Sequence, residues 1–83
     1  MHANDTMKRH AALVDDMART LGVDLEESVL RAEITPEEVV DAVLNCTGCT
    51  SPETCRGWLE ATDSAEAPPE YCRNKQTLAA LRP

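Results

Sequence analysis

Four cysteines, all in the second half of an 83-residue chain, constrain what this sequence can fold into more than any other feature. Their spacing is Cys46-x2-Cys49-x5-Cys55-x16-Cys72, and the first three fall in the stretch NCTGCTSPETCRGWL. The chain has no Phe, one Trp and one Tyr, so its apolar core is thin. Small domains with a thin core commonly need a metal or disulfides as well. We therefore expect the cysteines to have a structural role before any other.

The N-terminal half has the periodicity of amphipathic helices. Apolar residues recur at steps of three and four over residues 5–21, which predicts a helix with Asn4 or Asp5 as its N-cap and Gly22 just past its end. A shorter helix should follow, capped by Asp24. Its apolar side chains are predicted to lie on one side; they are Leu25, Val29 and Leu30.

Proline marks two further helix starts. The sequence TPEE predicts a helix that begins at Pro36 and ends near Asn45, with Thr35 and Glu38 forming a capping box. The sequence SPET repeats the start signal, with Ser51 as the N-cap. A last helix is expected over residues 73–81, after a loop that contains a double proline.

No segment alternates with a period of two for long enough to predict a strand. The fold class expected is therefore all-α, a compact bundle of four to five short helices stapled by a four-cysteine site. One domain should span residues 1–83, with acidic helices in residues 1–45 and the cysteine site in residues 46–83.

The net charge of −7 excludes some partners. An acidic chain without a basic stripe does not suit nucleic acid or an anionic membrane surface, and no apolar run is long enough for a membrane span. The first 20 residues lack the features of a secretory signal, so we expect a reducing cytoplasm. In that compartment clustered cysteines indicate a metal or catalysis more often than disulfides.

The cysteine spacing favours a centre with four sulfur ligands. A C-x2-C unit with a glycine in its loop lets two thiols converge, and a helix start and a late loop supply the other two, so Cys46, Cys49, Cys55 and Cys72 are the predicted metal ligands. A redox-active C-x-x-C of the thioredoxin type needs its reactive cysteine at a helix N-terminus in a βαβ unit. Neither condition holds for Cys46, which is expected at the end of a helix.

Two metal centres remain open, together with disulfides or free thiols. Zinc sites usually show two C-x2-C units and need the sulfurs close around one ion, whereas a [4Fe–4S] cluster is wider and accepts irregular spacing. The C-x2-C-x5-C run also resembles the cluster loop of helix–hairpin–helix DNA glycosylases, although the basic DNA-reading surface is missing here. We favour the [4Fe–4S] cluster, with Zn²⁺ as the alternative.

Five further residues lie next to the expected centre in the sequence, and each also has an ordinary structural interpretation. The two arginines could offset the negative charge of the thiolates or be solvated, and the two aromatic residues could shield the centre or simply fill the core. The asparagine could cap the last helix, which is the expectation, or donate a hydrogen bond to a sulfur. These residues are Arg56, Arg73, Trp58, Tyr71 and Asn74.

The stretches CTGCTSPETCRGWL and APPEYCRN together resemble a family of short, uncharacterised bacterial proteins. The pattern is C-x2-C-x5-C-x2-W-L followed by P-x-[FY]-C-x-N, and it covers about residues 45–81. The matching positions are Cys46, Cys49, Cys55, Trp58, Leu59, Pro69, Tyr71, Cys72 and Asn74. The resemblance implies a shared cysteine site and fold, and it implies no activity.

The function expected is that of a small iron–sulfur protein, used for electron transfer or for redox or iron sensing with a protein partner. All four ligand positions would be filled by protein, which leaves no open position for a substrate. The sequence has no Ser/His/Asp order, no phosphate-binding glycine loop and no carboxylate–histidine metal motif, so no catalytic residue is predicted. The alternative is a zinc-stapled module whose acidic helices dock a partner.

Overall fold

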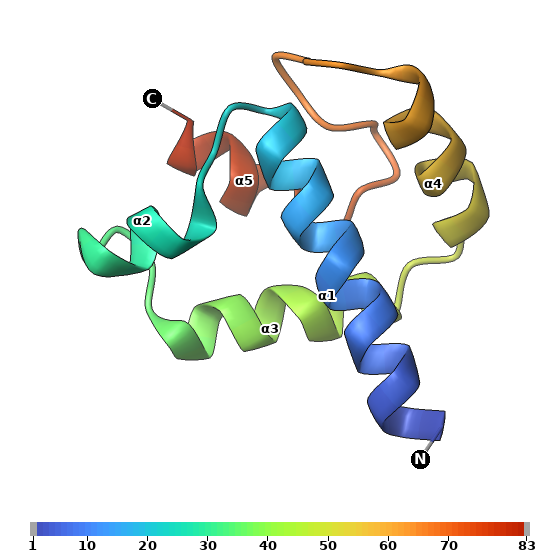
Figure 1. Ribbon diagram of the computed structural model, residues 1–83, viewed down its shortest axis with the longest axis horizontal. Helices are drawn as coiled ribbons and strands as arrows, with labels where there is room; N and C mark the ends of the chain where they lie inside the picture. The colour runs from blue at the N-terminus through green and yellow to red at the C-terminus, as the bar shows by residue number, and fades with distance from the viewer. Residues whose placement is uncertain (1, 83) are drawn as a thin grey trace.

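The chain folds into five helices, shown in Figure 1, and the computed structural model describes residues 2–82, with side chains from residue 5 onward. No strand occurs in that range, so the predicted all-α class is confirmed. The molecule is flattened, with extents of 32 × 28 × 17 Å. None of the described helices is both long and apolar enough to cross a membrane.

Helix α1 (His2–Thr20) is the longest element and begins before the predicted start. The prediction of an N-cap at Asn4 or Asp5 is therefore wrong; no glycine or proline interrupts the helix before these residues. The predicted end at Gly22 is confirmed. Gly22 has a φ of +79°, and the backbone N–H of Val23 reaches the carbonyl of Ala18 at 2.8 Å. This is the Schellman arrangement, which favours glycine because it needs a left-handed residue.

Helix α2 (Leu25–Leu30) is short and capped as predicted, because the Asp24 carboxylate accepts a hydrogen bond from the backbone N–H of Glu27 at 3.2 Å. Its buried face differs from the prediction. Leu30 is 81% exposed, while Ser28 is only 4% exposed. With fewer than two full turns, the helix leaves room for one buried position, and the small Ser28 occupies it.

Helix α3 (Pro36–Thr47) begins with the predicted capping box. The Thr35 hydroxyl accepts from the backbone of Glu38 at 3.1 Å, and the Glu38 carboxylate accepts from the backbone of Thr35 at 3.0 Å. The helix continues past the predicted end near Asn45 and is capped by Gly48. The first cysteine of the C-x2-C unit therefore lies inside the last turn of a helix rather than in a loop.

Helices α4 (Pro52–Ala61) and α5 (Lys75–Leu81) form the second half of the fold. The predicted start of α4 is confirmed, with Ser51 at the N-cap position and Pro52 as the first helical residue. The Ser51 side chain makes no capping hydrogen bond, however. The same holds for Asn74 at the start of α5, so the predicted capping role of its side chain is wrong.

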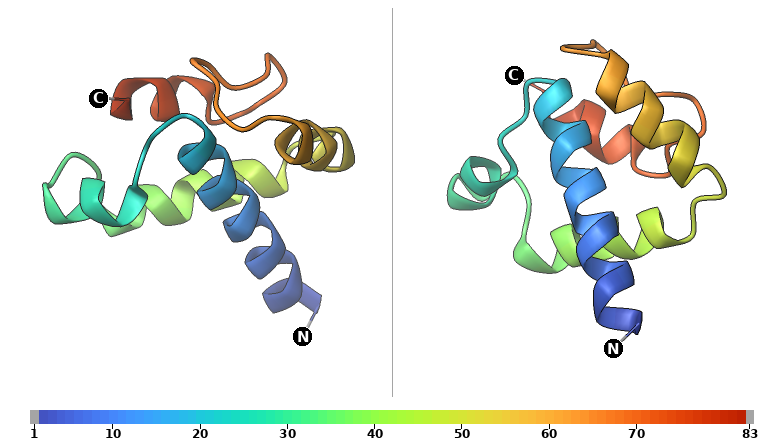
Figure 2. Two further views of the ribbon diagram at one scale, coloured as in Figure 1. Left: turned by 45° about the horizontal axis from the view of Figure 1, so that its top comes forward. Right: turned by 45° about the vertical axis from the view of Figure 1, so that its right-hand side comes forward.

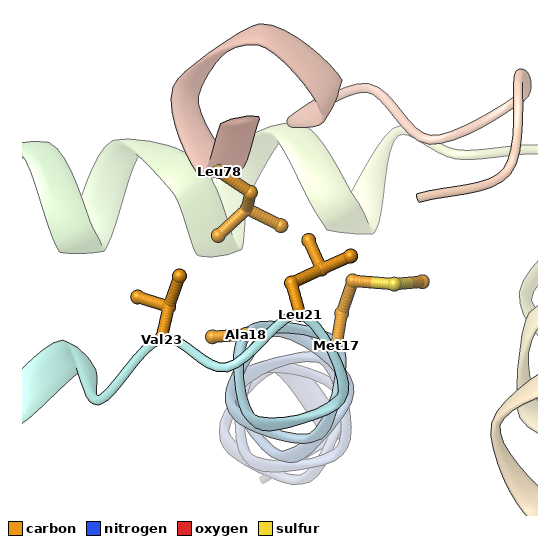
Figure 3. Packing of buried hydrophobic residues seen from close by; sticks show 5 residues of the cluster. All are labelled: Met17, Ala18, Leu21, Val23 and Leu78. Atoms are coloured by element: carbon orange, nitrogen blue, oxygen red, sulfur yellow. The ribbon is translucent and has the colours of Figure 1, made fainter. Parts of the chain in front are cut away.

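Helix α1 is the centre of the packing: it lies against both α3 and α4, and Figure 2 shows it crossing α3. The main core cluster joins the C-terminal end of α1 to α5, as Figure 3 shows. Its buried members are Met17, Ala18, Leu21, Val23 and Leu78. A second, smaller cluster joins α1 to α3 through Val14, Ala42 and Val43.

Candidate metal centre

The four cysteines lie at four places in the second half of the chain. Cys46 is in the last turn of α3, Cys49 follows the helix cap, Cys55 is in the first turns of α4, and Cys72 precedes α5. All four are free thiols, and all four are partly buried. Their side chains are therefore neither locked in disulfides nor fully withdrawn from the surface.

The segment before α5 has to return from the far end of α4 to bring Cys72 to the other cysteines (Figure 1). Asn74 holds it in place: its side-chain N–H donates to the carbonyl of Ala42 in α3 at 2.7 Å. The side-chain amide of Asn45 donates in turn to the Asn74 oxygen at 3.3 Å. Because Asn74 is 3% exposed and lies two residues after Cys72, it fixes Cys72 beside the end of α3.

The electrostatics of the thiols show that the structure gathers all four in one region. Burial, and then the charges of Cys55, Cys49 and Cys72, raise the pKa of Cys46 to about 11. The pKa of Cys55 is raised by burial and then by Cys72 and Cys49. Burial also raises the pKa of Cys72, with Cys49 adding to the effect and a backbone hydrogen bond from Asn74 opposing it. Every pair among the four cysteines is therefore within electrostatic range.

The raised thiol pKa values determine the protonation state of the cysteines. Burial, and then the repulsion between neighbouring thiolates, keep Cys46, Cys55 and Cys72 protonated at neutral pH. A bound metal replaces those protons and removes the repulsion.

Backbone N–H groups point at two of the sulfurs. The N–H of Ser51 lies 3.4 Å from the sulfur of Cys49, and the backbone of Asn74 acts to lower the pKa of Cys72 against the larger effect of burial. Such donors stabilise negative charge on sulfur and are one of the means by which proteins set the potential of iron–sulfur centres. The sequence gives no sign of them, because backbone donors have no residue signature.

The sulfurs are not arranged around a single ion. Among the side chains described, those of residues 5–82, no group of three or more His, Cys, Asp or Glu has the geometry to hold one metal ion. A tetrahedral zinc site would need sulfurs roughly 3.8 Å apart, because each Zn–S bond is ~2.3 Å. In a four-iron cluster each thiolate binds a different iron, so the sulfurs stand farther apart.

The two aromatic residues differ in their surroundings. Trp58 packs against the main core cluster together with Cys55 and Cys72, which fits both interpretations of Trp58. Tyr71 lies beside the cysteines: its backbone oxygen is 4.0 Å from the sulfur of Cys49. Its hydroxyl oxygen is buried and has no hydrogen-bond partner within the described part of the chain. Tyr71 is thus the polar group near the cysteines whose partner is unaccounted for.

The two arginines lie in different places. The side chain of Arg73 lies next to the C-x2-C loop, since a Cβ on Gly48 would come within 3.9 Å of the Arg73 Nε. Arg56 instead lines a groove of about 520 Å³ between α1 and α4, which has both acidic and basic side chains in its lining. The structure therefore brings Arg73 to the cysteine loop, and Arg56 faces a different surface.

The His10 side chain makes a hydrogen bond within its own helix. The Nδ1 of His10 is 2.8 Å from the backbone carbonyl of Thr6, one turn earlier in α1. The side chain of His2 lies outside the described residues. The candidate ligands at the site are the four cysteines.

The link between Asn74, Ala42 and Asn45 is the main feature of the site that sequence analysis missed. An asparagine directly before a helix has the pattern of an N-cap, and nothing local distinguishes a cap from a long-range bond. A buried amide that joins residues about 30 positions apart becomes visible only in the folded chain.

Comparison with other proteins gives a family and no activity. No curated protein and no solved structure matches this sequence. The model of one family matches over residues 1–83, which includes the N-terminal helices as well as the cysteine region. The chain therefore belongs to this family, described as a family of unknown function (DUF6455).

Proposed function

We propose that Cys46, Cys49, Cys55 and Cys72 bind one [4Fe–4S] cluster, and that the protein uses it to transfer single electrons or to sense redox state or iron. The observation that carries the proposal is the gathering of four free, partly buried thiols, each within electrostatic range of the other three. These thiols come from a helix end, a helix start and a returning loop. Such convergence is expected of a ligand set.

Three features favour a cluster over a single zinc ion. The irregular cysteine spacing, with a single C-x2-C unit, suits a cluster better than a zinc ion. The backbone N–H groups near Cys49 and Cys72 are donors of the kind that iron–sulfur sites use. The Arg73 side chain beside Gly48 supplies positive charge at the C-x2-C loop.

The chemistry of such a centre is the gain and loss of one electron. Four thiolates and an oxidised [4Fe–4S]²⁺ core carry a total charge of about −2, and one electron from a reduced carrier protein makes it about −3. No proton or bond rearrangement is required. Because the cysteines are only partly buried, a partner protein can approach the centre closely enough to exchange that electron.

The proposal includes a reducing compartment, the cytoplasm, and a protein partner rather than nucleic acid or membrane. The free thiols fit such a compartment. The net charge of −7 repels nucleic acid and anionic lipid surfaces. The same charge suits a partner that presents a basic surface.

A zinc-stapled interaction module is the second candidate function, and exposed apolar residues on α3 favour it. Val40 and Leu44 lie one turn apart and are 52% and 50% exposed. Glu37 and Asp41 are on the same helix and are exposed as well. A partner helix with apolar and basic side chains would complement this face. Zinc would then act only as a staple, after the sulfurs close around one ion.

Purification without oxygen separates the two candidates. The cluster predicts a brown protein with broad absorption near ~400 nm and equal amounts of iron and acid-labile sulfide. The zinc module predicts a colourless protein with one zinc per chain. Protein purified in this way with zinc and no iron would contradict the cluster proposal.

Single Cys→Ser variants at the four positions then test the ligand set. Each should lose most of its iron and much of its folding stability together, because metal binding and folding are coupled. Thr50→Ser, in the same loop, is the matched control and should keep the iron content of the natural sequence. A Cys→Ser variant that keeps full iron content removes that cysteine from the ligand set.

A further inference from the structure

The groove between α1 and α4 is a second site of interest, separate from the cysteines, none of which is among the described residues that line it. Its volume of about 520 Å³ lies within the range of small-molecule sites, roughly 300–1,000 Å³. The two helices run in about the same direction (Figure 2). Lining residues from early in both helices therefore lie toward one end of the groove, and those from later positions lie toward the other end.

The middle of the groove is apolar. Leu13 of α1 and Leu59 of α4 both line it. Leu13 is 7% exposed, and Leu59 packs against the main core cluster, so the core holds both side chains in place. Ala12, which is exposed, lines the groove as well, and its small side chain leaves space between the helices. An aliphatic chain could lie along this middle section.

The charged residues of the lining are three arginines and three acids, so the groove is neutral in a chain whose net charge is −7. One arginine is matched within the protein: Arg19 pairs with Asp15 at 3.1 Å and with Asp16 at 2.9 Å. The four other charged residues form no ion pair among the described residues. They are Arg9, Arg56, Glu60 and Asp63.

These four unmatched charges are sorted by sign along the groove. Arg9 and Arg56 come from the earlier parts of α1 and α4, whereas Glu60 and Asp63 come from the end of α4 and the loop after it. Arg56 and Glu60 are separated by about 6 Å along the helix axis, at ~1.5 Å per residue. The groove therefore presents two cations at one end, two carboxylates at the other, and apolar side chains between them.

We propose that this groove binds a small zwitterionic molecule whose negative and positive groups are separated by an aliphatic chain. The negative group contacts Arg9 and Arg56. The positive group contacts Glu60 and Asp63, and the chain lies against Leu59. A ligand with a single charge leaves one pair of protein charges unmatched, which selects against it. This inference goes beyond the proposed function and requires no metal.

Four probe molecules test the predicted chemistry. 6-Aminohexanoate carries its two charges at opposite ends of an aliphatic chain, and at pH 7 it should shift the amide NMR signals of α1 and α4. Hexanoate and hexylamine each lack one charge, and glycine has both charges but no chain between them. Each of these three should bind at least about two- to fivefold more weakly, which is the range for the loss of one exposed ion pair.

Substitutions then locate the site. The double variant Arg9→Gln, Arg56→Gln should reduce the affinity for 6-aminohexanoate by at least about two- to fivefold. Arg31→Gln is the matched control, because Arg31 is an exposed arginine that pairs with Glu27 and does not line this groove. Ala12→Leu should also weaken binding, since it fills the space between the helices with another good helix former.

The outcomes decide the proposal whatever the cysteines bind. It is supported if 6-aminohexanoate binds more tightly than the other three probes and if the Arg9/Arg56 double variant and Ala12→Leu both lose that preference. Equal affinity for all four probes, signal shifts spread beyond α1 and α4, or no saturable binding of 6-aminohexanoate would overturn it.

Discussion

The two halves of this protein are built in different ways. In residues 2–45, α2 and α3 carry side-chain caps, and the end of α1 is closed by a Schellman turn at Gly22. In residues 46–82, neither α4 nor α5 has a side-chain cap, and α4 has no buried residue. Local sequence signals therefore specify the first half, whereas the second half depends on contacts between residues far apart in the sequence.

A few contacts hold the second half of the chain against the first. Leu78 inserts into the core cluster of α1 (Figure 3), and Asn74 binds the backbone of α3. The proposed centre would add a third link through the cysteines. The comparison predicts that damage to these links unfolds residues 46–82 first and that damage to a local cap has a small effect. The following predictions run from the largest expected effect to the smallest.

Removal of the proposed cluster should have the largest effect on stability, and this effect should fall on the second half of the chain. We expect the amide protons of α4 and α5 to exchange at least about tenfold faster in the metal-free protein, because binding and folding are coupled there. Amides in the middle of α1 and α3 should change much less. Hydrogen exchange with mass spectrometry on the loaded and stripped protein measures both. Equal loss of protection throughout residues 2–82 would mean that the two halves fold as one unit.

Leu78→Ala should be the most damaging substitution outside the cysteines. Leu78 is 1% exposed and joins α5 to α1, so its truncation should lower the free energy of unfolding by about 2–5 kcal/mol. Leu30→Ala is the matched control: Leu30 is 81% exposed, and the expected change is within about 0.5 kcal/mol. Urea unfolding measures both values. A small loss for Leu78→Ala would show that α5 is not held by this core.

Asn74→Ala should lower the free energy of unfolding by about 1–3 kcal/mol, because it removes the side chain that donates a 2.7 Å hydrogen bond to the carbonyl of Ala42. Iron content should also fall, since Cys72 loses its anchor to α3. Asn45→Ala removes only the 3.3 Å hydrogen bond between the two side chains. It should lower the free energy of unfolding by less than about 1 kcal/mol. Thermal unfolding and iron analysis of both variants provide the check. Equal effects of the two substitutions would argue against the anchoring role of Asn74.

The caps provide the smallest and most specific comparison. Thr35→Ala should lower the free energy of unfolding by about 1 kcal/mol, because the Thr35 hydroxyl accepts a 3.1 Å hydrogen bond at the start of α3. Ser51→Ala should change the stability by less than about 0.5 kcal/mol, since Ser51 makes no capping hydrogen bond. Denaturant unfolding of the two variants tests the difference. A larger cost at Ser51 would contradict the structure of α4.

The sequence predicted best what depends on neighbouring residues. The capping box at Thr35, the cap at Asp24 and the stop at Gly22 all follow from short patterns, and all three are confirmed. The sequence places Leu25, Val29 and Leu30 on one side of α2, and Leu30 is exposed, because periodicity over six residues does not say which residues meet the core. Asn74 has the pattern of a cap and makes a tertiary hydrogen bond instead.

The same distinction between local patterns and long-range contacts applies to the candidate site. The spacing of the cysteines pointed to one centre, and the folded chain brings all four within electrostatic range of one another. The spacing says nothing about the Ser51 N–H near Cys49 or about the orphaned Tyr71 hydroxyl. Both depend on how the segment before α5 returns to α3, and that path is determined by long-range contacts rather than by local propensity.

The central claim is that one iron–sulfur cluster joins the four cysteines, and native mass spectrometry of protein purified without oxygen tests it most directly. The account predicts a single bound species whose added mass equals four iron and four sulfide atoms, lost together when any one of the cysteines is replaced by serine. A mass increased by a single zinc ion, or a chain with two disulfides and no metal, would contradict it.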